Sequence, residues 1–199
     1  LLWPRLTANL ERFSPASLTA VIIDPVLDYD PEACRTDRRS VDVLIDFVRD
    51  RSLSVIRVLE THAHADHLTA SAVIHDSLGC PMAIGRGICK VQRHFRKVFD
   101  LGDGLPADGS QFHELLDDGD RIAMGDLEIR VMSTPGHTDD SVTYLIGDAA
   151  FIDAAQPGDI VLDPLFNLNR NRIYWGLIAL RLIDKRADLL TATKVLQEA

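Results

Sequence analysis

One short segment constrains this chain more than any other: residues 61–67 read Thr-His-Ala-His-Ala-Asp-His. With Glu60 before it, the segment follows Leu53–Leu59, a mostly apolar run rich in β-branched residues that predicts a buried strand. Side chains two positions apart on a strand point to the same side. His62 and His64 are therefore expected to face one site at the end of that strand.

Beyond these two histidines the chain is expected to turn into a helix, which can bring Asp66 and His67 back to the same site. Three imidazoles and a carboxylate suit a borderline divalent metal such as zinc or iron. A second signal, Ser-Thr-Pro-Gly-His-Thr at residues 133–138, also follows a predicted strand. Its Pro and Gly predict a sharp turn that aims His137 out of the sheet end, so we expect His137 to be a further ligand.

The order of predicted elements is typical of a layered α/β fold, because strands and helices alternate before a run of strands. The predicted strands are Thr19–Ile23, Leu53–Leu59, Met82–Ile84, Phe112–Leu116, Arg121–Met124, Leu127–Ser133, Ser141–Ile146 and Ala149–Ile152. The predicted helices are Ser40–Arg49, Leu68–Leu78 and Ile88–Phe99, with two more in Ile173–Leu196. Polar, turn-rich chain or loop is predicted for Asp28–Arg39 and Leu101–Ser110.

Chain length, net charge and apolar stretches indicate how many domains to expect and which classes of partner are unlikely. The 199 residues suit a single domain over residues 1–199. The net charge of −9, without a Lys/Arg block, argues against nucleic acid, because an acidic surface repels phosphate backbones. The longest apolar stretch, Ile173–Ile183, is too short and too charged to span a bilayer, so no membrane partner is expected either.

The cysteines bear on the compartment. There are three, an odd number whose spacing fits neither a disulfide framework nor a metal knuckle: Cys34, Cys80 and Cys89. We interpret them as thiols of a reducing compartment. The expected location is the cytoplasm, or the mitochondrion if a targeting segment precedes this sequence.

The two histidine motifs together, H-x-H-x-D-H and T-P-G-H-T, resemble the signature of metallo-β-lactamase-fold proteins. Three segments are similar to the persulfide dioxygenase branch, which includes bacterial β-lactamase-like hydrolases: Ile22–Val26, Leu59–Ala70 and Tyr144–Phe151. Glyoxalase II, a thioester hydrolase, shares the metal motifs. The resemblance covers about residues 19–152 and implies an αββα sandwich, incomplete or diverged at both ends.

For the metal, the resemblance implies one ferrous iron bound by His62, by His137 and by a later aspartate. Asp153 is the candidate, although it stands one residue short of the family's spacing, in Phe-Ile-Asp where the family has Phe-x-Gly-Asp. A one-residue shift on a strand turns a side chain to the other face, so either Asp153 still serves or this ligand is lost.

The activity implied by this iron site is oxidation of a glutathione-type persulfide to sulfite with O2. His64, Asp66 and His67 would then orient ligands and water, and Asp66 and His67 are the candidate catalytic residues.

Two alternatives stay open. In a zinc-dependent thioester hydrolase of the glyoxalase II type, the five motif residues bind zinc, and a bridging hydroxide attacks a thioester. No histidine follows His137, which leaves the second metal site of such a hydrolase incomplete. The other alternative is a metal-binding but inactive regulator or assembly protein. The partner is accordingly a small-molecule thiol persulfide or thioester, with a homo-oligomer expected if apolar sheet surface is exposed.

Overall fold

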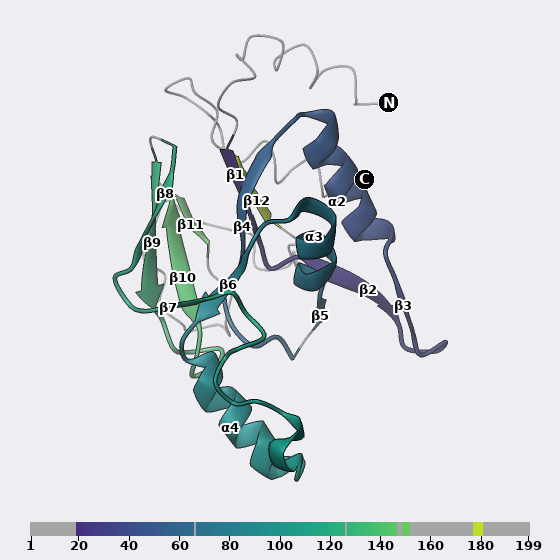
Figure 1. Cartoon of the computed structure of the whole chain (residues 1–199), viewed down its shortest axis with the longest axis vertical. Helices are drawn as coiled ribbons and strands as arrows, with labels where there is room; N and C mark the ends of the chain where they lie inside the picture. Colours follow the sequence, from purple (N-terminus) through teal and green to yellow (C-terminus); the bar gives the residue numbers. More distant parts are fainter. Residues whose placement is uncertain (1–18, 66, 126, 147–148, 152–176, 181–199) are drawn as a thin grey trace.

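The computed structural model describes residues 19–65, 67–125, 127–146, 149–151 and 177–180. Its two larger sheets pack face to face, and two helices cover the outer side of the larger one, α2 (Arg39–Asp50) and α3 (Ser71–Leu78) (Figure 1). This arrangement confirms the layered α/β class and matches the metallo-β-lactamase fold that the motifs imply.

The larger sheet contains β1 (Thr19–Ile23), β4 (Ser54–Glu60), β6 (Met82–Gly85), β7 (Glu114–Leu116) and β12 (Leu177–Leu180). The order is β12-β1-β4-β6-β7, with β12 antiparallel to β1 and the other neighbours parallel. Strand β1 is buried on both faces, since Ala20 and Ile22 pack toward the helices while Val21 and Ile23 pack toward the second sheet. This double burial explains its unbroken apolar sequence.

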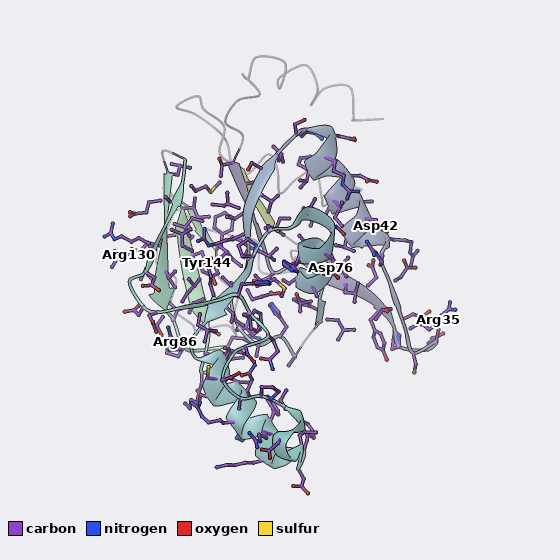
Figure 2. All side chains as sticks on the ribbon, in the orientation of Figure 1. Arg35, Asp42, Asp76, Arg86, Arg130 and Tyr144 are labelled. Carbon is purple, nitrogen blue, oxygen red and sulfur yellow. The ribbon has the colours of Figure 1, made fainter. Side chains whose placement is uncertain are left out.

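The second sheet contains β8 (Arg121–Met124), β9 (Leu127–Ser133), β10 (Val142–Ile146) and β11 (Ala149–Phe151). All of its pairs are antiparallel, in the order β11-β10-β9-β8. Residues of β9 alternate between buried Ile129 and Val131 and exposed Glu128 and Arg130, as expected for a sheet with one face on the core. Tyr144 of β10 is fully buried between the sheets (Figure 2).

The helices follow the predicted spacing. Val41, Leu44, Ile45 and Val48 form the buried face of α2, so the predicted helix Ser40–Arg49 is confirmed to within one residue at each end. Burying each of these side chains contributes about 1.5–3 kcal/mol. Helix α4 (Ile88–Val98) extends away from the sheets and buries only its first residue (Figure 1).

The prediction of irregular chain over Asp28–Arg39 was wrong. Strands β2 (Val26–Asp30) and β3 (Arg35–Asp37) form an antiparallel hairpin there. The last three residues of β2 and all of β3 are exposed or half-buried and mostly polar, so this range lacks the apolar alternation by which a strand is recognised.

Two predicted helices need correction. Leu68–Leu78 begins with a short strand, β5 (Leu68–Thr69), which pairs with β2, and helix α3 starts only at Ser71. The predicted helical tail Ile173–Leu196 contains β12, and the rest of that tail lies outside the described residues. A short apolar run fits either state, and here pairing with the edge of β1 decides for a strand.

Two further predictions concern thiols and membranes. Cys34, Cys80 and Cys89 are free thiols in the structure. Among the helices that the structure describes, none is long and apolar enough to cross a bilayer.

Candidate metal centre

The first part of the site lies where two parallel strands end. Asp24 follows β1 and the first histidine motif follows β4, so both lie at the carboxyl edge of the larger sheet, where α/β proteins bind ligands. The backbone N–H of Asp24 donates to the carbonyl of Leu59 at 3.0 Å. Asp24 has a φ of 47°, a left-handed conformation that aspartate tolerates better than most residues.

The second part is the loop between β9 and β10, which carries His137. Two hydrogen bonds join this loop to the first motif. The N–H of Ala63 donates to Oδ2 of Asp140 at 3.0 Å, and the N–H of Val142 donates to the carbonyl of Thr61 at 2.8 Å. The larger sheet and the second sheet therefore meet at this site.

Four imidazoles gather at this junction: His62, His64, His67 and His137, here named the histidine cluster. The ring centroids of His62 and His64 are 4.2 Å apart, those of His62 and His137 are 4.8 Å apart, and those of His64 and His67 are 4.1 Å apart. His62 is fully buried, His67 is half-buried and His137 is exposed, so the cluster runs from the interior to the surface.

Asp24 orients His62 through Thr61. The Thr61 hydroxyl donates to Oδ2 of Asp24 at 2.8 Å, so its oxygen is left to accept the Nδ1 proton of His62, 3.0 Å away. This tautomer leaves Nε2 of His62 as the atom that can bind a metal.

His64 is held by two carboxylates. Its Nε2 atom lies 2.9 Å from Oε2 of Glu60 and 3.1 Å from Oδ1 of Asp24. The side chain of His64 is only 5% exposed, and that of Glu60 only 1%. Because the Nε2–H group of His64 donates to the carboxylates, Nδ1 is the nitrogen of this ring suited to bind a metal, as in the carboxylate–histidine–metal arrangements of metalloproteins.

The charges in this group shift one another's pKa values. Burial alone would lower the pKa of His64, but hydrogen bonds and charges from Asp24 and Glu60 raise it to about 10. Burial works to raise the pKa of Asp24, and contact with His64 outweighs it, so that pKa is lowered. Burial dominates for Glu60 and raises its pKa. The two carboxyl groups therefore differ in acidity, and Asp24 is the stronger acid.

The structure brings His62, His64, His67 and His137 together as expected, whereas Asp66 and Asp153 lie outside the described residues. Sequence reasoning missed four polar residues that hold the cluster: Asp24, Glu60, Thr61 and Asp140. An acidic residue ending each of two buried strands was the available signal, because a buried carboxylate needs a partner.

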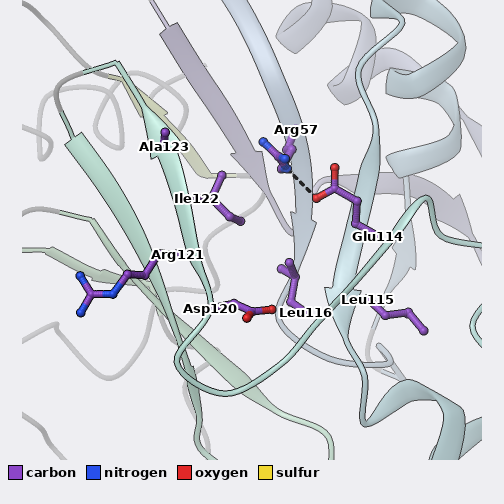
Figure 3. A pocket seen from close by; sticks show the side chains of 8 residues that line it. All are labelled: Arg57, Glu114, Leu115, Leu116, Asp120, Arg121, Ile122 and Ala123. Carbon is purple, nitrogen blue, oxygen red and sulfur yellow. Dashed lines mark hydrogen bonds and ion pairs between the residues drawn. The ribbon is translucent and has the colours of Figure 1, made fainter.

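Asp24, Glu60 and His64 also lie close enough to one another to be considered as three metal ligands themselves. We interpret them as a hydrogen-bonded support instead, since the Nε2 atom that would have to bind the metal already contacts both carboxylates. A separate cavity of about 530 Å³ opens between β4, β7 and β8, around the ion pair of Arg57 and Glu114 (Figure 3). None of the motif histidines lines it, so we do not assign the metal chemistry to that cavity.

Comparison with known proteins gives one family. Residues 18–165 match the family model described as the Metallo-beta-lactamase superfamily. A probable metallo-hydrolase of Burkholderia pseudomallei is 46% identical over 155 residues, covering 77% of this chain and 53% of that protein. A beta-lactamase hydrolase-like protein of Agrobacterium fabrum is 41% identical over 138 residues, covering 69% of this chain and 32% of that protein.

A more distant relative is the mitochondrial persulfide dioxygenase of Homo sapiens. It is 28% identical over 147 residues, covering 73% of this chain and 44% of that protein. The chain thus spans about half of the first relative and a smaller share of the other two.

Proposed function

Because the chain belongs to the metallo-beta-lactamase superfamily, we propose that it is a metal-dependent enzyme that oxidises a glutathione-type persulfide with O2, and that its metal is ferrous iron. The observation that carries the proposal is the ring contact of His62 with His137, 4.8 Å between centroids, from two separate loops. Two imidazoles and one carboxylate make a facial set that leaves positions open for a sulfur ligand and O2.

The donor set fits such a metal. Thr61 fixes the tautomer of His62 that presents Nε2, and the carboxylates behind His64 are typical outer partners of a metal site. His62 and His137 would hold the iron with Asp153 as the proposed carboxylate, while His64, Asp66 and His67 would orient ligands and water. When bound, ferrous iron supplies the redox chemistry by which O2 reacts with the persulfide sulfur.

The overall reaction balances with one water. One persulfide, one O2 and one water give one thiol and one sulfurous acid, which ionises to sulfite. The direct test is oxygen uptake by the iron-loaded protein with glutathione persulfide, followed by assay of sulfite. We expect one sulfite per O2 consumed. An iron-loaded wild-type protein that takes up no oxygen above a buffer control would refute the oxidation.

A zinc-dependent thioester hydrolase is the second candidate. It is favoured by the contact of His67 with His64, 4.1 Å between centroids, which adds a fourth imidazole to the cluster. Two relatives of higher identity than the persulfide dioxygenase are a probable metallo-hydrolase and a beta-lactamase hydrolase-like protein. In this case the zinc-loaded protein hydrolyses S-lactoylglutathione without consuming oxygen. Metal binding without turnover of either substrate would instead favour the inactive regulator or assembly protein.

A further inference from the structure

Glu60 is a buried carboxylate whose two oxygens accept hydrogen bonds from different residues. It is the last residue of β4 and is 1% exposed. Among the described residues its side chain is hydrogen-bonded by His64, Thr69 and Ser71, none of which is a lysine or arginine. Burying a carboxylate destabilises a fold unless every lone pair finds a donor.

The two oxygens of Glu60 have separate partners. Oε1 accepts hydrogen bonds from the hydroxyls of Thr69 and Ser71. The backbone N–H of Ser71 donates to Oγ1 of Thr69 at 3.1 Å, and the Thr69 hydroxyl can in turn donate to Glu60 or to Oγ of Ser71. Ser71 is the first residue of α3, so this oxygen is anchored to the start of that helix.

The other oxygen of Glu60, Oε2, contacts the imidazole of His64. It lies 2.9 Å from Nε2 of His64, which is its only hydrogen-bond partner among the described residues. Oδ1 of Asp24 lies farther from the same nitrogen, at 3.1 Å, and also accepts the N–H of Thr61 at 2.7 Å. Glu60 is thus the nearer acceptor and the one that is not shared.

We propose that Glu60 is a positioning residue which, together with Asp24, holds His64 by Nε2 and turns its Nδ1 atom toward the metal site. The two nitrogens of an imidazole point away from each other, so fixing one fixes the direction of the other. Nδ1 of His64 and Nε2 of His62 are both buried, and the centroids of the two rings are 4.2 Å apart. The inference rests on the proposed metal site: Nδ1 of His64 would bind zinc, and beside an iron held by His62, His137 and Asp153 the same atom would orient ligands and water.

The test measures zinc rather than turnover. The dissociation constant of zinc is determined for the wild type and for Glu60→Gln by competition with a chromophoric chelator. Glutamine keeps the shape of the side chain and removes its charge. Outer partners of ligating histidines typically contribute roughly 10–100-fold to metal affinity, and we expect a loss of that size. Glu114→Gln is the matched control, because Glu114 is a half-buried carboxylate paired with Arg57 in the separate cavity.

A second readout reports the imidazole itself. Long-range ¹H–¹⁵N correlation spectra of the zinc-loaded wild type are expected to show His64 protonated at Nε2 and bound to zinc through Nδ1. If Glu60→Gln does not fold, Ser71→Ala replaces it, since that change removes one of the two hydroxyls on Oε1 and should weaken zinc binding in the same direction. Equal affinity of the folded variant and the wild type, zinc bound through Nε2, or a wild type that binds no zinc would each overturn the proposal.

The test of Glu60 can succeed or fail independently of the test of the proposed reaction. If Glu60→Gln weakens zinc binding and the wild type binds zinc through Nδ1 of His64, but the iron-loaded protein consumes no oxygen with persulfide, the oxidation is wrong and the role of Glu60 stands. If oxygen is consumed while Glu60→Gln binds metal as the wild type does, the oxidation stands and the positioning role is wrong.

Discussion

Asp140 accepts a hydrogen bond from the backbone N–H of Ala63, at 3.0 Å, and so joins two loops that are 77 residues apart in sequence. Ala63 separates the two histidines that follow β4, and Asp140 comes three residues after His137. The distance between the His62 and His137 rings therefore depends on this contact. Asp140 is 4% exposed, which shields its end of the bond from competing water.

Replacing Asp140 with alanine should loosen the junction. The N–H of Ala63 would lose its acceptor, a loss that costs about 1–3 kcal/mol in a buried setting. We expect a lower free energy of unfolding in urea and weaker zinc binding. Asp139→Ala is the matched control: its side chain is 76% exposed in an ion pair with Lys90, and surface changes of this kind stay within about 0.5 kcal/mol. Equal effects of the two substitutions would contradict the role given to Asp140.

Gly87 allows the start of α4 to approach the same loop. A Cβ atom at Gly87 would lie 2.7 Å from Cβ and 2.8 Å from Cα of Asp140, closer than real contacts permit. Gly87→Ala should therefore destabilise the fold by about 1–3 kcal/mol, as overpacking does. Gly104→Ala, where a Cβ would meet nothing within 4 Å, provides the comparison. Thermal denaturation of both variants measures the difference, and a Gly87 variant as stable as the Gly104 variant would argue against the close approach.

The fold was predictable where burial leaves a pattern in the sequence. Strand β1 is apolar on both faces and α2 is apolar on one, and both were predicted nearly to the residue. The β2–β3 hairpin was not, because β3 is exposed and polar and β2 is apolar mainly at its first two residues. Strand β12 was mistaken for a helix because its partner, the edge of β1, is remote in sequence and only the assembled sheet selects a strand.

The hydroxyl of Thr61 links Asp24 to His62 and so fixes the orientation of the His62 ring. Thr61→Val keeps the volume but leaves Oδ2 of Asp24 and Nδ1 of His62 without this partner in a buried setting. We expect zinc affinity to fall and stability to drop by about 1–3 kcal/mol. Thr61→Ser retains the hydroxyl and should stay close to the wild type in chelator competition. A valine variant with unchanged zinc affinity would remove Thr61 from the site.

His137 should be needed for stabilisation by metal. A ligand present at 100 times its dissociation constant stabilises a folded protein by about 2.7 kcal/mol, so zinc should raise the melting temperature of the wild type. His137→Ala is expected to lose most of that increase. The control is His94→Ala, since His94 is exposed on α4 and its ring contacts only Phe95 among the described aromatic residues. Thermal scans with and without zinc distinguish the two variants, and an equal zinc response in both would exclude His137 as a ligand.

The candidate site, like the fold, was predictable from the sequence only in part. Histidines placed after predicted strands could be expected to converge, and the cluster of His62, His64 and His137 has that origin. Their supports could not be foreseen, because Glu60 and Asp24 meet His64 only after β1 and β4 have paired in parallel. A single sequence shows which residues are reactive, whereas three-dimensional pairing decides which residues restrain them.

The pairing of β12 with β1 has a consequence for the time course of synthesis. Ala20 pairs with Leu180, so one edge of the larger sheet waits for a segment made 160 residues later. At roughly 5–20 residues per second a ribosome needs on the order of ten to thirty seconds to bridge that interval. Until then the backbone N–H and C=O groups along β1 offer a template for any other extended chain. The nascent chain should therefore depend on chaperones while this edge is open.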